Sequence, residues 1–528
     1  MRRVRSFFIN ALILTAVSFI MRSVGVAFNV YVSNRVGAEA MGLYSLISGV
    51  YGFAVTLATS GINLAVVRLV SEAIGSGEHG AVRGIMRRAF CHCLFFGGLS
   101  MILVYCLSTA IGVGVLCDGR TVLSLRIFAF SLPFIALSSA FHGYFTAVRK
   151  AYKNALVSMG EQLIKIFAVA WLLNTLMPSG IEYACVSLVL GGALSEVVSC
   201  LTVALLWWCE RMKHGIDEKK DGRRRSLLGI SIPVAFSAYA RSALLTVEHA
   251  LIPRGLKRSG VAHGEALAAY GAVHSMAFPI IMFPSAFIYS FSGLLVPELA
   301  ECRESCNERQ IRYIASRVFS FSLMFSIGVA GIMMTFADEI GQVIYPDMGI
   351  EQYIRLLAPL IPVMYTDGTV DAMLKGLGHQ VFSMNVNIFD ATLSVVLVWL
   401  LLPSMGIYGY IVTLFVCEIL NASLSTTRAL RSIGIRPRVL KWIFQPVACI
   451  AGASGLVRAA VHFTANSADP TPQTLVLSIL ITAVIYILLL RATSTLSAED
   501  SRWIRGIFSK SKEDKALCTS GEPERRHG

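Results

Sequence analysis

The chain has 528 residues, of which 55% are hydrophobic and only 15% are charged, a composition too apolar for a water-soluble protein of this size. Its formal net charge of +14 does not indicate nucleic-acid binding, because the basic residues lie in short loops between apolar segments rather than on one continuous face. The composition therefore predicts an integral membrane protein.

Apolar segments recur along the whole chain, and each is long enough to cross a hydrocarbon core of about 30 Å as a helix. Their spacing predicts an all-α polytopic membrane protein with about fourteen transmembrane helices. The expected spans lie near 7–32, 41–67, 89–112, 121–147, 154–177, 181–209, 227–252, 266–296, 313–337, 353–376, 381–402, 406–430, 439–463 and 472–491.

The order of these segments predicts two equal blocks of six helices followed by a further pair. The predicted units are an N-terminal bundle (1–209), a basic cytoplasmic linker (210–226), a C-terminal bundle (227–430), two additional transmembrane helices (431–491) and a cytoplasmic tail with an amphipathic helix (492–528). Most Lys and Arg residues fall in alternate loops and at the two ends, which predicts that both termini are cytoplasmic. The basic loop around Arg254 is the exception.

An internal repeat relates the two six-helix blocks. Arg22-Ser23 in the first span recurs as Arg241-Ser242 in the seventh, and Gly143 recurs as Gly368 at the equivalent place in the tenth. Transporters are commonly built from such repeats, with the substrate site between them. We therefore expect two bundles around a central cavity.

Arg22 and Arg241 lie deep in their predicted spans, and an ionisable group there normally faces a partner or a water-filled cavity. Two guanidinium groups in one cavity would offer forked donors to a diphosphate. The alternative is that each arginine is neutralised by a structural carboxylate such as Glu248.

The second block also carries acidic residues within its spans. Asp367, Asp371 and Lys375 are spaced four apart and share one helical face, while Asp390 replaces Lys165 of the first block. Asp367, Asp371, Asp390 and Lys165 are therefore candidates for coupling transport to a proton or sodium gradient. The alternatives are simple intrahelical ion pairs, Asp371 with Lys375 and Glu161 with Lys165.

No Walker A motif, catalytic triad spacing or HExxH motif is present, and no pair of Cys or His residues is joined by a second pair at zinc-site spacing. The sequence therefore predicts neither an enzyme nor a resident metal or other cofactor, beyond a coupling cation or the membrane potential.

Several motifs resemble the stage V sporulation protein B branch of polysaccharide flippases. They are ALILTAVSFIMRSVG, VGAEAMGLYSL, GINLAVVRLVSEA, AAYGAVHSMAFPIIMFPSAF, LLVPELAE, DAMLKGLGHQ and LLPSMGIYGY. The resemblance spans nearly the whole chain. It implies the multidrug/oligosaccharidyl-lipid/polysaccharide exporter fold, with alternating access to a central cavity.

By the same resemblance, Arg22 corresponds to a first-helix arginine that lines a cationic cavity in lipid II flippases. These flippases also carry an arginine in the eighth helix, where this chain has His274, while Arg68 is a further basic candidate in the second helix. The substrate-binding candidates are thus Arg22, Arg241, Arg68, Glu248 and His274.

Three functional hypotheses follow. The first is a flippase in the cytoplasmic membrane for an undecaprenyl diphosphate-linked saccharide or peptidoglycan precursor, serving sporulation, wall growth or capsule export. The second is a cation-coupled multidrug exporter on the same fold. The third is a scaffold that recruits envelope-synthesis enzymes through the basic linker and tail.

Overall fold

The computed structural model describes residues 2–495 except 60, 76–79, 178–179, 214–226, 305–306, 347, 436–437, 465–470 and 494. Throughout the described residues the regular structure is helical, without a strand. The elements are α1 (Arg2–Thr59), α2 (Ile62–Gly75), α3 (Ala81–Thr109), η1 (Ala110–Val115), α4 (Thr121–Ala147), α5 (Ala151–Leu176), α6 (Ile181–Lys213), α7 (Leu227–Arg258), α8 (His263–Gly271), η3 (Ala272–Ala277), α9 (Phe278–Met282), α10 (Ser285–Glu304), α11 (Glu308–Thr335), α12 (Ala337–Ile344), α13 (Glu351–Leu357), η4 (Ala358–Leu360), α14 (Ile361–Gly376), α15 (Gln380–Met405), α16 (Ile407–Ile433), η5 (Leu440–Phe444), α17 (Gln445–Thr464) and α18 (Pro472–Ala492).

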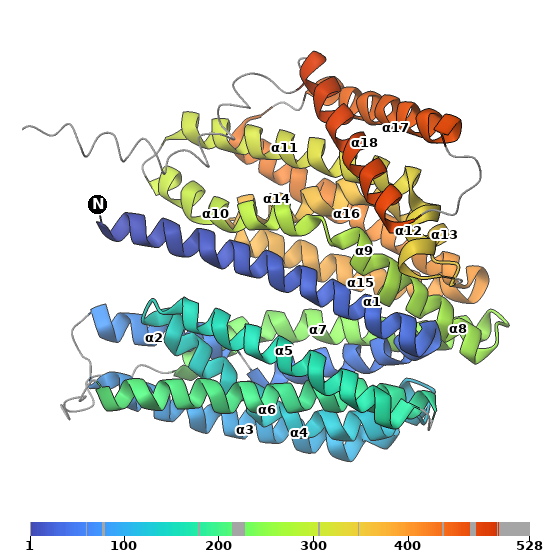
Figure 1. Ribbon diagram of the computed structural model, residues 1–528. Coiled ribbons are helices and arrows are strands. Elements are labelled where there is room, and N and C mark those ends of the chain that lie inside the picture. Colours follow the sequence, from blue (N-terminus) through green and yellow to red (C-terminus); the bar gives the residue numbers. More distant parts are fainter. Residues whose placement is uncertain are drawn as a thin grey trace, which may run out of the picture.

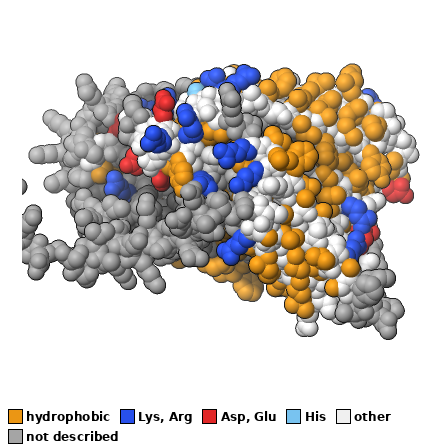
Figure 2. Space-filling model, turned by 90° about the horizontal axis from the view of Figure 1, so that it is seen from above, with side chains coloured by type: hydrophobic (Ala, Val, Ile, Leu, Met, Phe, Trp, Pro, Cys, Tyr) orange, Lys and Arg blue, Asp and Glu red, His pale blue; other side chains and the backbone are white. Residues whose placement is uncertain are grey.

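Eleven stretches among the described residues are long and apolar enough to cross a membrane. Large apolar side chains also cover the outside of the helices: Phe167 and Trp171, one turn apart on α5, are 73% and 67% exposed. Figure 2 shows a broad area of hydrophobic side chains on one outer face, with Lys and Arg side chains gathered toward the N-terminal end. Such an apolar exterior requires lipid as its solvent, so the predicted all-α membrane fold is confirmed.

The first two predicted spans lie within one continuous helical element. Gly37 interrupts α1 with φ 82° and ψ 169°, a conformation that glycine adopts without the steric cost other residues meet. The chain therefore reverses at Gly37, and the stretch that qualifies as one span, Phe19–Ile74, covers two predicted crossings. The total of fourteen crossings stays a prediction.

The eighth predicted span is broken, and the tenth, near 353–376, consists of the contiguous elements α13, η4 and α14. The stretch predicted near 266–296 is divided into α8, the π-helix η3, α9 and α10, with Pro279 at the start of α9 and Pro284 between α9 and α10. Proline removes a backbone donor and crowds the preceding turn, which interrupts the helix. The short helix α12 between α11 and α13 was not predicted.

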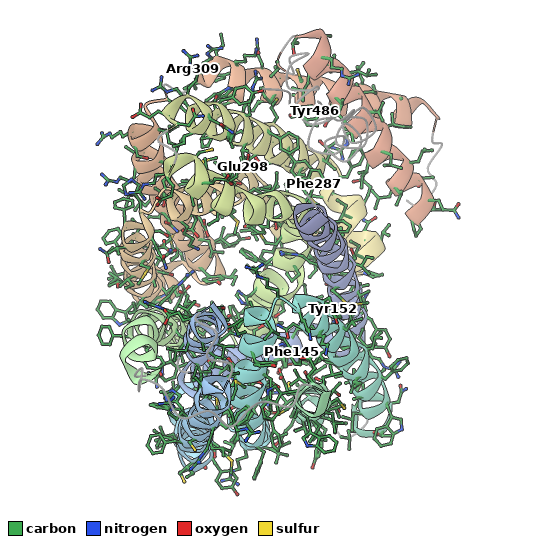
Figure 3. All side chains as sticks on the ribbon, turned by 90° about the vertical axis from the view of Figure 1, so that its left-hand side faces the viewer. Phe145, Tyr152, Phe287, Glu298, Arg309 and Tyr486 are labelled. Carbon is green, nitrogen blue, oxygen red and sulfur yellow. The ribbon has the colours of Figure 1, made fainter. Side chains whose placement is uncertain are left out.

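The helices form two groups, which Figure 3 shows from the end that carries the N-terminus. Phe145 and Tyr152 mark the group built from the first half, and Phe287 and Glu298 mark the group built from the second. Within the first group, α4 packs against α3, α6 and α2, while in the second α14 packs against α10, α11 and α16.

Two equivalent glycines support the internal repeat. A Cβ at Gly143 would lie 2.9 Å from the backbone oxygen of Asn63 on α2, and one at Gly368 would lie 2.3 Å from the ring of Tyr289 on α10. Both glycines therefore allow the fourth helix of each half to approach the second closely. The repeat seen in the sequence is thus a repeat of helix packing.

The C-terminal pair α17 and α18 packs against α11. The Tyr486 hydroxyl donates a hydrogen bond to the Met324 carbonyl (2.8 Å), and a Cβ at Gly331 would lie 2.3 Å from Ile450 of α17. These contacts attach the extra helices to the second half. Residues 210–213 of the predicted linker continue α6, while residues 214–226 and the amphipathic tail helix lie outside the described residues, so both stay predictions.

Gly331→Ala should lower the thermal stability of the purified protein, because the added methyl group forces α17 away from α11 at a cost of about 1–3 kcal/mol. Differential scanning fluorimetry in detergent would measure the change. Gly455→Ala on α17 is the matched control, because a Cβ there meets no atom within 4 Å. An equal melting temperature for the two variants would contradict the packing.

Candidate substrate cavity

A cavity of about 470 Å³ lies between the two halves of the molecule. Its walls come from both arms of α1, from α7 and from the η3–α9 segment. The lining residues are Gly25, Val26, Asn29, Met41, Tyr44, Ser45, Ser48, Gly49, His249, His274, Ser275 and Pro279. The size is that of a small-molecule site, and its place is the one the repeat predicted.

The cavity is sealed at the end of the molecule opposite the N-terminus, where α1 meets α8 (Figure 1). A Cβ at Gly42 would lie 2.1 Å from the Leu267 carbonyl oxygen, and one at Gly271 would lie 2.1 Å from the Ala38 carbonyl oxygen. The two backbones are therefore in direct contact, an approach that only glycine permits at both positions.

Charged side chains reinforce this seal. Arg120, before α4, pairs with Asp118 (2.7 Å) and with Glu39 on α1 (3.0 Å), and His263 at the start of α8 contacts Asp118 (3.2 Å). Burial alone would raise the pKa of Asp118, but the hydrogen bonds and charge of Arg120 together with His263 outweigh it and lower this pKa. Asp118 is therefore ionised at neutral pH, and the network joins the first half to the second.

Arg22 lies in the first arm of α1 and is exposed. Its Nη2 donates to the Met282 carbonyl (3.2 Å) and to the Ser285 hydroxyl (3.4 Å), both at the α9–α10 break, and its guanidinium lies 5.9 Å from the Tyr289 ring centroid. Among the described residues no carboxylate lies within 4.0 Å of it. Since a guanidinium carries five N–H groups, donors remain for an anionic ligand.

Arg241 on α7 is also exposed, but its surroundings are acidic. Asp367 on α14, Asp390 on α15 and Glu418 on α16 all interact electrostatically with it. The two arginines are therefore equivalent in the repeat but differ in environment. Glu248 is buried, and its neighbours are Ser394 and Asp390 rather than an arginine.

The other predicted residues lie outside the cavity lining or form local pairs. Asp371 pairs with Lys375 (2.6 Å), and Arg68 pairs with Glu72 (3.1 Å) on an exposed face. The pair predicted between Glu161 and Lys165 is absent from the described residues. Glu161 instead accepts a hydrogen bond from Ser199 on α6 (2.8 Å), while Lys165 interacts electrostatically with Glu196.

His274 belongs to an aromatic cluster that sequence reasoning missed. Its Nδ1 lies 3.3 Å from the Tyr410 hydroxyl, and Nδ1 of His249 lies 2.7 Å from the Tyr270 hydroxyl. The two imidazole centroids are 5.2 Å apart. His274 lies in the π-helix η3, a distortion that is frequent at functional sites, and no local motif identifies such a segment in advance.

A family model described as "Polysaccharide biosynthesis protein" matches residues 7–303, which is more than half of the chain, and a model described as MatE matches residues 259–400. Stage V sporulation protein B of Bacillus subtilis (strain 168) is 26% identical over 477 residues, covering 88% of this chain and 92% of that protein. Sporulation protein YkvU of the same organism is 22% identical, covering 79% and 94%.

Among solved structures, the lipid II flippase MurJ in an inward closed conformation superposes with a TM-score of 0.69 at 14% identity, covering 92% of this chain and 99% of that one. A multidrug resistance MATE family transporter in an inward-facing conformation gives 0.63 at 14% identity, covering 80% and 98%. These neighbours have the same fold, and the activities in their titles are flippase and transporter activities rather than enzymatic ones.

Gly42→Ala should loosen the seal, because its methyl group cannot occupy the space held by the Leu267 carbonyl. A cysteine introduced at Ser48 in the cavity should then react faster with a membrane-impermeant maleimide applied from the sealed side. Gly52→Ala on the same helix is the matched control, since a Cβ there meets nothing within 4 Å. Unchanged labelling in Gly42→Ala would show that this contact does not close the cavity.

Proposed function

Because the chain belongs to the polysaccharide biosynthesis protein family, we propose that it moves a lipid-linked saccharide precursor across the cytoplasmic membrane by alternating access. The cargo is a saccharide or peptidoglycan precursor carried on undecaprenyl diphosphate. The similarity to stage V sporulation protein B and the fold shared with a lipid II flippase support a cargo used in envelope construction.

The observation that carries the proposal is the environment of Arg22. Arg22 lies one turn before the cavity-lining Gly25 on α1, and its guanidinium contacts a carbonyl, a hydroxyl and an aromatic ring rather than a carboxylate. A cation held in this way keeps its charge for an anionic ligand, and a guanidinium matches phosphate oxygens with paired donors. A positive charge at Arg22 would not help an exporter to bind cationic drugs.

Transport requires the cavity to open alternately to each side. With both termini in the cytoplasm, the sealed end at Gly42 and Gly271 faces outward, and the cargo enters from the cytoplasmic side. Opening outward must separate these two backbones and break the contact between His263 and Asp118, which joins the halves.

The acidic residues of the second half are the proposed coupling site. Asp367 and Asp390 each have a buried carboxylate oxygen, Oδ1, without a hydrogen-bond partner among the described residues. A buried carboxylate without a partner is costly, and a proton, a sodium ion or the movement of Arg241 toward it would relieve that cost. A cation gradient or the membrane potential would thereby drive the return step.

Arg22→Ala should weaken binding of undecaprenyl diphosphate about ten- to hundredfold, since hydrogen bonds to a charged group contribute about 1.5–3 kcal/mol. Native mass spectrometry of the purified protein, titrated with the lipid, would measure the loss. Arg22→Lys should restore only part of the affinity, because an ammonium lacks the planar fork.

Arg126→Ala is the control for loss of a basic residue. Arg126 lies on α4 and donates to Ser108 Oγ on α3 (3.1 Å), away from the cavity lining. If the Arg22→Ala and Arg126→Ala proteins bound the lipid as tightly as the unaltered protein, the phosphate role of Arg22 would be wrong.

A cation-coupled multidrug exporter is the second candidate, favoured by the carboxylates beside Arg241 and by the MATE structural neighbours. The two functions make opposite predictions for Arg22 and for the acidic residues. In an exporter, the carboxylates bind the cation or drug and Arg22 has no part in transport.

Asp390→Asn and Asp367→Asn should slow flipping of a fluorescent diphosphate lipid in liposomes that carry an imposed cation gradient, while leaving equilibrium binding of that lipid within about twofold, because neither residue lines the cavity. For an exporter, these substitutions would instead abolish resistance of cells to cationic dyes, and Arg22→Ala would have no effect. Comparing the effects of the two Asp substitutions with the effect of Arg22→Ala therefore decides between the two candidates.

A further inference from the structure

The cavity has an uncharged lining, although Arg22 lies only one turn before Gly25 on α1. None of the lining residues is an Asp, Glu, Lys or Arg. The polar lining consists of hydroxyl, amide and imidazole groups, which belong to Asn29, Tyr44, Ser45, Ser48, His249, His274 and Ser275. We refer to these seven residues and the space they enclose as the apex pocket.

The apex pocket is held in shape by bonds between the two halves. Asn29 donates to the Ser275 carbonyl (2.7 Å), the Ser275 hydroxyl donates to the Met41 carbonyl (3.2 Å), and Ser45 and Ser275 share a hydrogen bond. The π-helix η3 places His274 and Ser275 next to each other on this wall. A set of polar groups fixed in this way is preorganised for a ligand.

Each imidazole at the apex pocket has one nitrogen already engaged. His249 and His274 contact tyrosine hydroxyls through Nδ1, so Nε2 is the remaining polar atom of each ring. Ser48 and Tyr44 add hydroxyl groups from the second arm of α1. These groups can both donate and accept hydrogen bonds, which is what sugar hydroxyl and acetamido groups require.

The position of the apex pocket relative to Arg22 fits a sugar attached to a diphosphate. Asn29 follows Arg22 by seven positions on the same helix, a rise of about 10 Å at 1.5 Å per residue. This is about the length of one or two sugar rings. The cavity volume of about 470 Å³ also accommodates such a group, whereas a polyprenyl chain would leave the polar lining without partners.

We propose that the apex pocket binds the neutral saccharide adjoining the diphosphate, while Arg22 contacts the phosphates. This inference rests on the proposed function and specifies its substrate. The pocket selects an uncharged sugar, because the lining offers no cation for a uronic acid and no carboxylate for an amino sugar. The saccharide is thereby located between the phosphate site and the outward seal.

The test compares two lipids on the full-length purified protein: undecaprenyl diphosphate, and the same lipid carrying one N-acetylglucosamine. The sugar-bearing lipid should bind about tenfold more tightly, because one or two extra hydrogen bonds contribute about 1 kcal/mol each. Ser48→Phe, which fills the pocket, should abolish this preference without weakening the sugar-free lipid. Tyr44→Phe, which removes only a hydroxyl, should reduce the preference about fivefold by the same reasoning.

Ser404→Phe, at an exposed position near the end of α15, controls for the added ring. Melting temperatures identify a variant that fails to fold, and Tyr44→Phe then carries the test. Equal binding of the two lipids by the unaltered protein, or a preference that survives both Ser48→Phe and Tyr44→Phe, would overturn the sugar site and leave the flippase proposal standing. Failure to bind either lipid would overturn both. A third lipid carrying glucuronic acid should bind no better than the sugar-free lipid, and tighter binding would contradict selection of a neutral sugar.

Discussion

The contact between Gly42 and Gly271 is the constraint on which the rest of the arrangement depends. It brings the backbones of α1 and α8 together at one end of the molecule, and the cavity exists because the two halves meet there and diverge away from it. A backbone contact of this kind needs no large side-chain rearrangement to form or separate. The same contact therefore closes one end of the cavity and, in the alternating access we propose, is the part that must separate.

The two halves share one packing plan but have acquired different chemistry. Gly143 and Gly368 show that the helices cross in equivalent ways, whereas Arg22 meets a carbonyl and an aromatic ring and Arg241 meets carboxylates. A symmetric pair of arginines would hold an anion without a preferred orientation. In the function we propose, this asymmetry divides the tasks, with anion binding at Arg22 and cation coupling near Arg241.

The broken segment from α8 to α10 links these features. Pro279 and Pro284 interrupt it, and the breaks expose the Met282 carbonyl that Arg22 contacts. Irregular backbone within a membrane is tolerated only where it is buried in protein or lines a cavity. The irregular segment thus contacts Arg22, lines the apex pocket and forms one side of the seal. In the function we propose, it is the element that connects ligand binding to opening.

The sequence by itself determined the membrane fold, the helix positions and the repeat, because lipid imposes helices of a minimum apolar length and an apolar exterior. It also identified Arg22 and Arg241 as residues needing explanation, since a charge deep in a span is costly. Only the tertiary structure decided which partners they have, that Glu161 bonds to Ser199, and that His249 and Ser48 line the cavity. Serines and a histidine carry no distinctive signal in an apolar sequence, and their roles arise from which helices meet, a contact between residues more than two hundred positions apart.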